Sequence, residues 1–138
     1  MWWIYALLSA FFAGLTAVLA KVGIKGIDSN LATAIRTVVI LILAWAIVFF
    51  RNNHQGFSGL TKQNWIFLIL SGLATGLSWV FYFKALQLGK VSQVAPVDKA
   101  SVAIAILLSV IFLGEPLTLK TTIAVLMIIG GTIILIFQ

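Results

Sequence analysis

The stretch "VAPVDKASVAI" (Val94–Ile104) places Asp98 and Lys99 at the head of a long apolar run. A carboxylate and an ammonium in such a run can bind a charged solute or take part in proton coupling. Pro96 has no backbone N–H, so the Ser92 carbonyl loses its helical partner if the helix extends back that far. Freed backbone at membrane depth is tolerated where it is buried in protein or lines a cavity. Together these residues predict a substrate or ion site at this end of the segment.

Arg36 lies inside another apolar run, flanked by "LATAI" and "TVVILILAW". A charge at the bilayer centre costs at least about 2.5–3.5 kcal/mol, so Arg36 and Asp98 are expected to face a bundle interior or an aqueous cavity. Asp98 and Lys99 point about 100° apart on a helix, which disfavours their pairing. Arg36 can bind a carboxylate with two hydrogen bonds, which makes it the predicted partner of Asp98. Five charged residues are expected at one level of the bundle, forming a polar vestibule: Lys21, Arg36, Lys84, Asp98 and Lys99.

An alternative needs no site. Pro96 would open the helix, and Asp98 in the first turn would complement the positive helix end. The lysines would extend to the lipid headgroups. Arg36 is the residue that this alternative explains least well, because apolar sequence continues on both sides of it.

Trp79, Tyr82 and Phe83 share one helical face in "SWVFYFKAL", beside Lys84. Their rings could stack on a substrate. They could equally belong to the aromatic belt at the membrane interface.

The composition indicates that lipid is the solvent for these segments. The chain has 138 residues, of which 62% are hydrophobic and 9% charged, against about 25% charged in soluble domains. Its net charge of +6 is carried by basic residues at segment ends, which favours interfacial anchoring over nucleic-acid binding. The apolar amino terminus lacks a basic region, so we expect a first membrane span there and not a signal peptide.

The segments predict an all-α integral membrane protein, a bundle of five transmembrane helices in one domain over residues 1–138. The predicted spans are about 2–22, 31–50, 65–86, 94–113 and 121–137. Glycine at the ends of the third and fourth spans predicts tight turns. Because five is odd, the termini are expected on opposite sides of the membrane, and two copies in tandem would be inverted.

The basic residues specify the orientation of the chain weakly. Four lysines lie at one membrane side (Lys21, Lys25, Lys84 and Lys90), and three basic residues lie at the other (Arg51, Lys62 and Lys120). Adding Arg36 and Lys99 to the first side favours an outside amino terminus. A single biased orientation and insertion in both directions both remain open.

The sequence carries no pattern of an enzyme, a metal site or a cofactor site. It has no cysteine, no metal-ligand spacing, no nucleotide-binding glycine loop and no pair of nucleophile and base. His54 is expected in a solvated loop, and Glu115 is expected to be a turn residue.

Two stretches resemble the EamA family of the drug/metabolite transporter superfamily. They are "YFKALQLGKVSQVAPVDKASVAIAILLSVIFLGEPLT" (Tyr82–Thr118) and "GGTIIL" (Gly130–Leu135). The front "AKVGIKGIDSNLATAIRTVVILILAW" (Ala20–Trp45) and "PVDKAS" look like the branch of bacterial and archaeal proteins with one five-span repeat. The resemblance implies one repeat where longer relatives carry two inverted repeats, and relatives export amino acids, metabolites or drugs.

Several functional expectations follow. A lone repeat should pair as a homodimer, parallel or antiparallel, in the inner cell membrane. Four basic groups around one acid favour a small anionic or zwitterionic metabolite, exported by alternating access. The expected site residues are Asp98, Lys99, Arg36, Lys21, Lys84, Pro96, Trp79 and Tyr82. Two rivals remain: a flippase for lipids or lipid-linked sugars, and a membrane subunit that does not transport.

Overall fold

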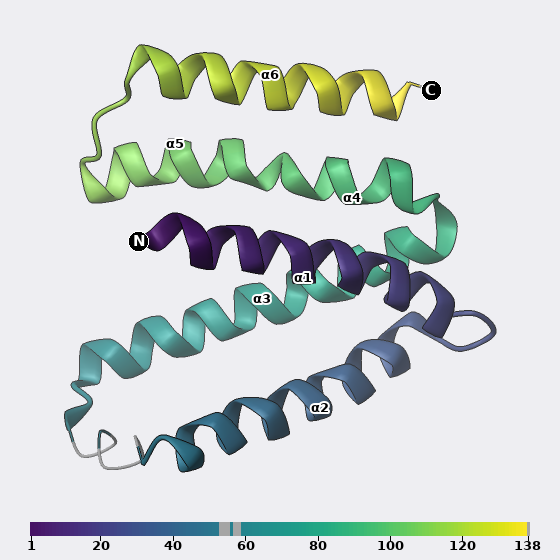
Figure 1. Ribbon diagram of the computed structural model, residues 1–138, viewed down its shortest axis with the longest axis vertical. Helices are drawn as coiled ribbons and strands as arrows, with labels where there is room; N and C mark the ends of the chain where they lie inside the picture. The colour runs from purple at the N-terminus through teal and green to yellow at the C-terminus, as the bar shows by residue number, and fades with distance from the viewer. Residues whose placement is uncertain (53–55, 57–58, 138) are drawn as a thin grey trace. The chain divides into compact units, whose positions relative to one another are not determined.

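The computed structural model describes residues 1–52, 56 and 59–137. It contains six helices in these residues, and Figure 1 labels each of them. Their bounds are α1 Trp2–Gly23, α2 Ser29–Phe50, α3 Lys62–Leu88, α4 Val91–Lys99, α5 Ser101–Leu113 and α6 Leu119–Ile136. Because α4 and α5 together form one membrane-length segment, Val91–Leu113, the helices provide five candidate membrane spans.

Each predicted span is present, and most begin earlier than predicted because their caps lie in polar sequence. The Asp28 carboxylate accepts hydrogen bonds from the backbone of Asn30 and Leu31, at 2.8 and 3.1 Å, and so starts α2. Thr118 accepts from the Thr121 backbone N–H and caps α6 in the same way. Gly114 ends α5 with a φ of +67°, a conformation that glycine adopts without strain.

The chain divides into two compact units. One unit is Met1–Lys21 with Leu88–Gln138, and the other is Val22–Gln87. The sequence predicted a single domain, and that prediction remains untested.

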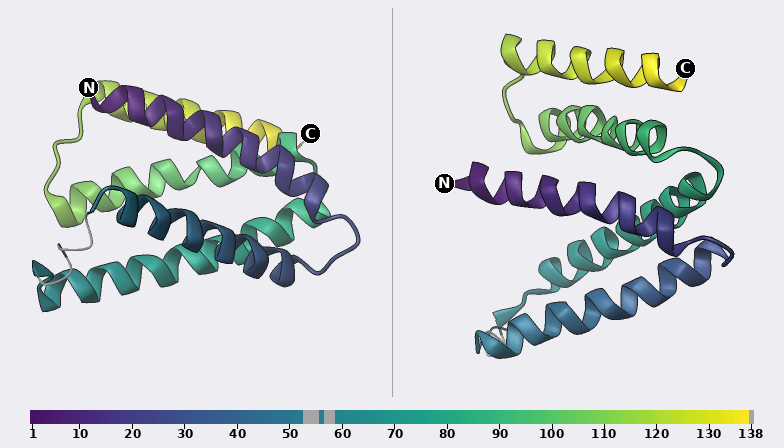
Figure 2. Two further views of the ribbon diagram at one scale, coloured as in Figure 1. Left: turned by 60° about the horizontal axis from the view of Figure 1, so that its bottom comes forward. Right: turned by 45° about the vertical axis from the view of Figure 1, so that its right-hand side comes forward.

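In the second unit, α2 and α3 form an antiparallel helical hairpin (Figure 2). The Gln87 side-chain amide donates a 2.7 Å hydrogen bond to the Ile27 carbonyl. This bond ties the end of α3 to the turn before α2. It lies at the same end of the hairpin as Phe83 and Leu86, which are 1% and 0% exposed.

In the first unit, α6 runs antiparallel beside α4 and α5 (Figures 1 and 2). The fourth span is interrupted at Ala100. Its N–H bonds to the carbonyl of Val97, three residues back, at 3.0 Å, whereas an α-helix would use the carbonyl four residues back. The two halves differ in composition, because α4 is "VSQVAPVDK" and α5 is "SVAIAILLSVIFL". Polar and charged groups of this span are therefore concentrated in α4.

Large apolar side chains are exposed along all the long helices, as expected for a multi-pass membrane protein whose surroundings are hydrocarbon. The paired glycines Gly72 and Gly76, and Gly130 and Gly131, have open space where a Cβ would stand. Within the described part of the chain no neighbouring helix uses these positions for close approach.

Candidate functional site

The guanidinium of Arg36 lies against aromatic rings of α3. Its central carbon is 4.4 Å from the centre of the Phe83 ring and 5.9 Å from that of Trp79. Tyr82 packs edge-on against Phe83, with ring centres 5.8 Å apart and planes at 74°. We call Arg36, Trp79, Tyr82 and Phe83 the Arg36 cluster. The cluster replaces part of the hydration that a cation loses inside a membrane with ring-face contacts.

The helix positions explain why these residues meet. Arg36 lies about 10 Å along α2 from its first residue, Ser29. Phe83 lies about 7–8 Å before the end of α3 at Leu88. Trp79, Tyr82 and Phe83 follow the spacing of one helical face, so the three rings lie on the same side of α3 within about one turn.

Phe83 does not behave as a residue of an interfacial aromatic belt, because its side chain is 1% exposed. Trp79 and Tyr82 are half-buried beside it. The sequence suggested either substrate stacking or an interfacial belt for these aromatics, and neither interpretation included a contact with Arg36. Two of the rings hold a cation of the protein itself.

Aromatic rings are the contacts that the structure describes for the Arg36 guanidinium. Among the described residues no carboxylate lies within ion-pair distance of it. A guanidinium has five N–H donors in one plane, and the Phe83 ring offers no oxygen or nitrogen lone pair to accept from them. The arrangement suits a carboxylate or another planar anion bound through two hydrogen bonds.

Pro96 is the sixth residue of α4, which begins at Val91 with Lys90 as its cap. The alternative in which Pro96 opens the helix is therefore wrong. The helix does extend back beyond Ser92, so the Ser92 carbonyl faces a proline nitrogen that has no proton to donate. Asp98 consequently lies in the last turn of α4 and not in a first turn.

Asp98 and Lys99 pair with each other, contrary to expectation. The Lys99 ammonium donates to a carboxylate oxygen of Asp98 at 3.3 Å. The Cβ atoms point apart, but the long lysine side chain reaches back around the end of α4. The side chains of Lys99 and Asp98 are 59% and 32% exposed, so the pair contributes little to stability.

Lys21 binds backbone. Its ammonium donates a 2.7 Å hydrogen bond to the carbonyl of Gly89, in the turn between α3 and α4. This contact attaches the end of α1 to the entry of the fourth span. Lys84, by contrast, is exposed.

The predicted site residues thus fall into separate groups. The structure brings Arg36 together with Trp79 in one unit, and Asp98 together with Lys99 in the other. The predicted Arg36–Asp98 pair and the common vestibule join residues of different units, so both remain predictions. Glu115 lies in the exposed turn before α6, as expected. His54 lies outside the described residues.

Thr132 was absent from the sequence-based set, yet it links two helices. It is 7% exposed, and its hydroxyl lies 3.4 Å from the Pro96 carbonyl and 2.8 Å from that of Ile128 in its own helix. The proline was the available signal, because a carbonyl freed by a helix break needs a donor from elsewhere.

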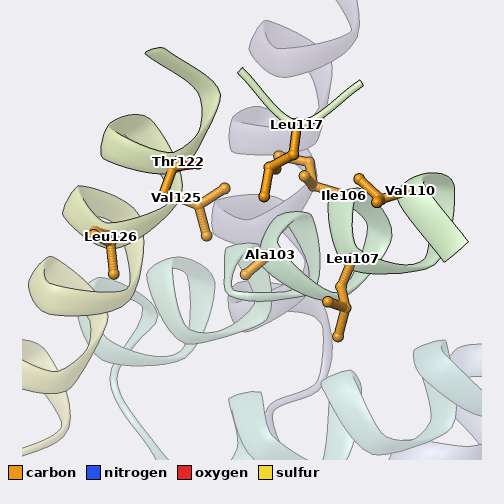
Figure 3. Close-up of a pocket in the computed structure, with 8 residues that line it drawn as sticks. All are labelled: Ala103, Ile106, Leu107, Val110, Leu117, Thr122, Val125 and Leu126. Carbon is orange, nitrogen blue, oxygen red and sulfur yellow. The ribbon is translucent and has the colours of Figure 1, made fainter. Parts of the chain in front are cut away.

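A groove of about 160 Å³ lies between α5, α6 and the segment that joins them (Figure 3). Its lining is apolar apart from the Thr122 hydroxyl and contains none of the predicted site residues. The lining side chains are Ala103, Ile106, Leu107, Val110, Leu117, Thr122, Val125 and Leu126. Such a groove suits an alkyl chain.

Comparison with known proteins gives a consistent result. Residues 1–137 match the model of the EamA-like transporter family. An "uncharacterized transporter in cobO 3'region" of Sinorhizobium sp is 50% identical over 134 residues, which cover 97% of this chain and 95% of that protein. The "uncharacterized transporter YxxF" of Bacillus subtilis (strain 168) is 27% identical over 129 residues, which cover 93% of this chain but 40% of YxxF. No solved structure matches significantly.

Proposed function

The chain belongs to the EamA-like transporter family, and on that basis we propose that it is a secondary exporter of a small anionic or zwitterionic metabolite. Export proceeds by alternating access, in a homodimer within the inner cell membrane. The observation that carries the substrate class is the Arg36 cluster, in which a half-buried guanidinium rests on Phe83 and has no carboxylate partner among the described residues.

Electrostatics favour an anion at this site. A half-buried cation within a membrane span and without a counter-ion is unfavourable, and a substrate carboxylate would supply the missing charge. Asp98 and Lys99 offer a second pair of charges for a zwitterion. A hydrophobic cation would meet the charge of Arg36 instead, at a cost in free energy.

The size of the chain relative to YxxF supports a dimer, since the matched region takes up 40% of that protein. Five spans place the two ends of one copy on opposite membrane sides, so an inverted second copy completes the two-repeat symmetry common among transporters. The open positions at Gly72 and Gly76 suit close approach of a helix from that copy.

The groove between α5 and α6 favours a second candidate, a lipid or lipid-linked sugar flippase. Its lining side chains are apolar apart from Thr122 (Figure 3), which would suit an acyl chain. Such a substrate would slide its chain along the groove while its headgroup crosses through the polar part of the protein.

Uptake into liposomes separates these candidates. The purified protein is reconstituted, and vesicles are tested with labelled amino acids, small carboxylates, inorganic phosphate and tetraphenylphosphonium. Headgroup-labelled phospholipid is followed in parallel by quenching at the outer leaflet. Uptake of an amino acid or carboxylate without that of tetraphenylphosphonium supports the exporter. Lipid translocation alone supports the flippase, and no flux in any assay favours a membrane subunit that does not transport.

A further inference from the structure

We propose that Thr132 is a positioning residue: its hydroxyl fastens the half-helix α4 to α6 through the carbonyl of Pro96. The contact rests on geometry, and its consequence for transport rests on the proposed function. Asp98 lies on the fastened half-helix, so the bond sets where that carboxylate is held.

The Pro96 carbonyl lacks its usual helical bond. In an unbroken helix it would accept from the N–H of Ala100, four residues on. That N–H instead bonds to the Val97 carbonyl at 3.0 Å. One turn earlier, the Ser92 carbonyl has lost its donor to the proline itself. The Ser92 loss lies within α4, whereas the missing bond from Ala100 to Pro96 lies at the junction of α4 with α5, where only the shorter-range bond to Val97 replaces it.

Thr132 supplies a replacement donor from α6. Its hydroxyl is almost fully buried and lies 3.4 Å from the Pro96 carbonyl and 2.8 Å from the Ile128 carbonyl. A hydroxyl has one proton, which it gives to one acceptor or shares between two. The side chain can therefore hold α4, or release it and stay satisfied within its own helix.

This arrangement gives α4 two states at low energetic cost. When the Thr132 hydroxyl donates to the Pro96 carbonyl, α4 is held against α6, where the two helices pack together. When the hydroxyl donates only to the Ile128 carbonyl, α4 can tilt about Ala100. Hydrogen bonds between membrane helices shift such equilibria by about threefold on average. A contact of this strength biases the equilibrium without fixing α4 in one state.

Hydrogen–deuterium exchange of the full chain in lipid nanodiscs tests this contact without a substrate. Thr132→Val removes the hydroxyl and keeps the shape, and we expect it to speed exchange in segment 91–100 about threefold. Thr132→Ser should match the wild type. Thr75→Val is the control, because the Thr75 hydroxyl bonds to Ser71 in its own helix at 2.9 Å. Should Thr132→Val not fold, the pair Thr132→Ser and Thr132→Ala makes the same comparison.

The proposal would be overturned if segment 91–100 of Thr132→Val exchanged at the wild-type rate, or if that of Thr132→Ser exchanged as fast as that of Thr132→Val. In liposomes, Thr132→Val should change the maximal rate of uptake and leave the KM near the wild-type value. A wild-type protein without uptake would instead remove the proposed function, and the exchange result would still decide the role of Thr132.

Discussion

The guanidinium carbon of Arg36 lies 4.4 Å from the centre of the Phe83 ring, so a membrane-embedded cation is supported by an aromatic face. The residues come from α2 and α3, which the chain joins through a long segment. The contact with Phe83 holds the Arg36 guanidinium in place within the hairpin of α2 and α3. It also explains how an arginine within an apolar span is accommodated without a carboxylate partner in the described chain.

Replacing Phe83 with leucine should displace Arg36. The substitution keeps an apolar side chain but removes the ring face, which in a desolvated setting contributes about 2 kcal/mol. We expect a lower thermal unfolding midpoint and at least tenfold weaker uptake of the anionic substrate. Phe81→Leu is the matched control, because Phe81 is 70% exposed on the same helix. Equal effects of the two substitutions would contradict a specific role for the ring.

Asp98→Asn should leave stability nearly unchanged and abolish transport. The ion pair that it breaks is exposed and contributes roughly 0–1 kcal/mol. Membrane levels and the unfolding midpoint should therefore resemble those of the wild type, whereas uptake falls to background. Normal uptake by this variant would show that Asp98 takes no part in binding or coupling.

Lys21→Met should destabilise the protein, in contrast to Asp98→Asn. It removes a 2.7 Å charge-assisted hydrogen bond to the Gly89 carbonyl, whose loss is expected to cost about 1 kcal/mol at this half-buried position. The measurement is the thermal unfolding midpoint in detergent. Lys25→Met, at an exposed lysine in the next turn, serves as control and should melt with the wild type. A Lys21→Met midpoint equal to that of Lys25→Met would show that the bond adds nothing.

Much of the fold could be predicted because lipid imposes a simple pattern. An apolar run of membrane length must be helical, so the five spans follow from hydropathy. The first residues of the helices were harder to predict, since caps such as Asp28 lie in polar sequence outside the apolar run. The break at Ala100 was anticipated only as a disturbance near Pro96. Its position depends on which carbonyl the Ala100 N–H selects, and composition does not encode that choice.

The site was predictable by residue type and less so by pairing. Arg36 stood out because a charge in hydrocarbon is costly, and Trp79 stood out as an aromatic beside a lysine. That these two residues meet is decided by how α2 packs on α3. Lys99 pairs with Asp98 because of side-chain reach, which helical angles alone do not include. Thr132 escaped notice because threonine is common in apolar helices.

Single-cysteine labelling should reveal chains in both orientations. The protein has no cysteine, so Lys25→Cys and Glu115→Cys each introduce a unique thiol at opposite membrane sides. With a membrane-impermeant reagent on spheroplasts, we expect each variant to label partially, because the basic residues are almost balanced and the proposed dimer is inverted. Labelling of Glu115→Cys alone would exclude an antiparallel homodimer and leave a parallel one.

The most direct test of the account is uptake by Arg36→Gln in liposomes, compared with Arg51→Gln. Arg51 caps the opposite end of α2 and is exposed, so its loss removes the same charge outside the cluster. If Arg36 binds the substrate anion, Arg36→Gln should lower uptake at least tenfold, while Arg51→Gln transports like the wild type. Wild-type uptake by Arg36→Gln would contradict the central claim that this guanidinium recognises the substrate.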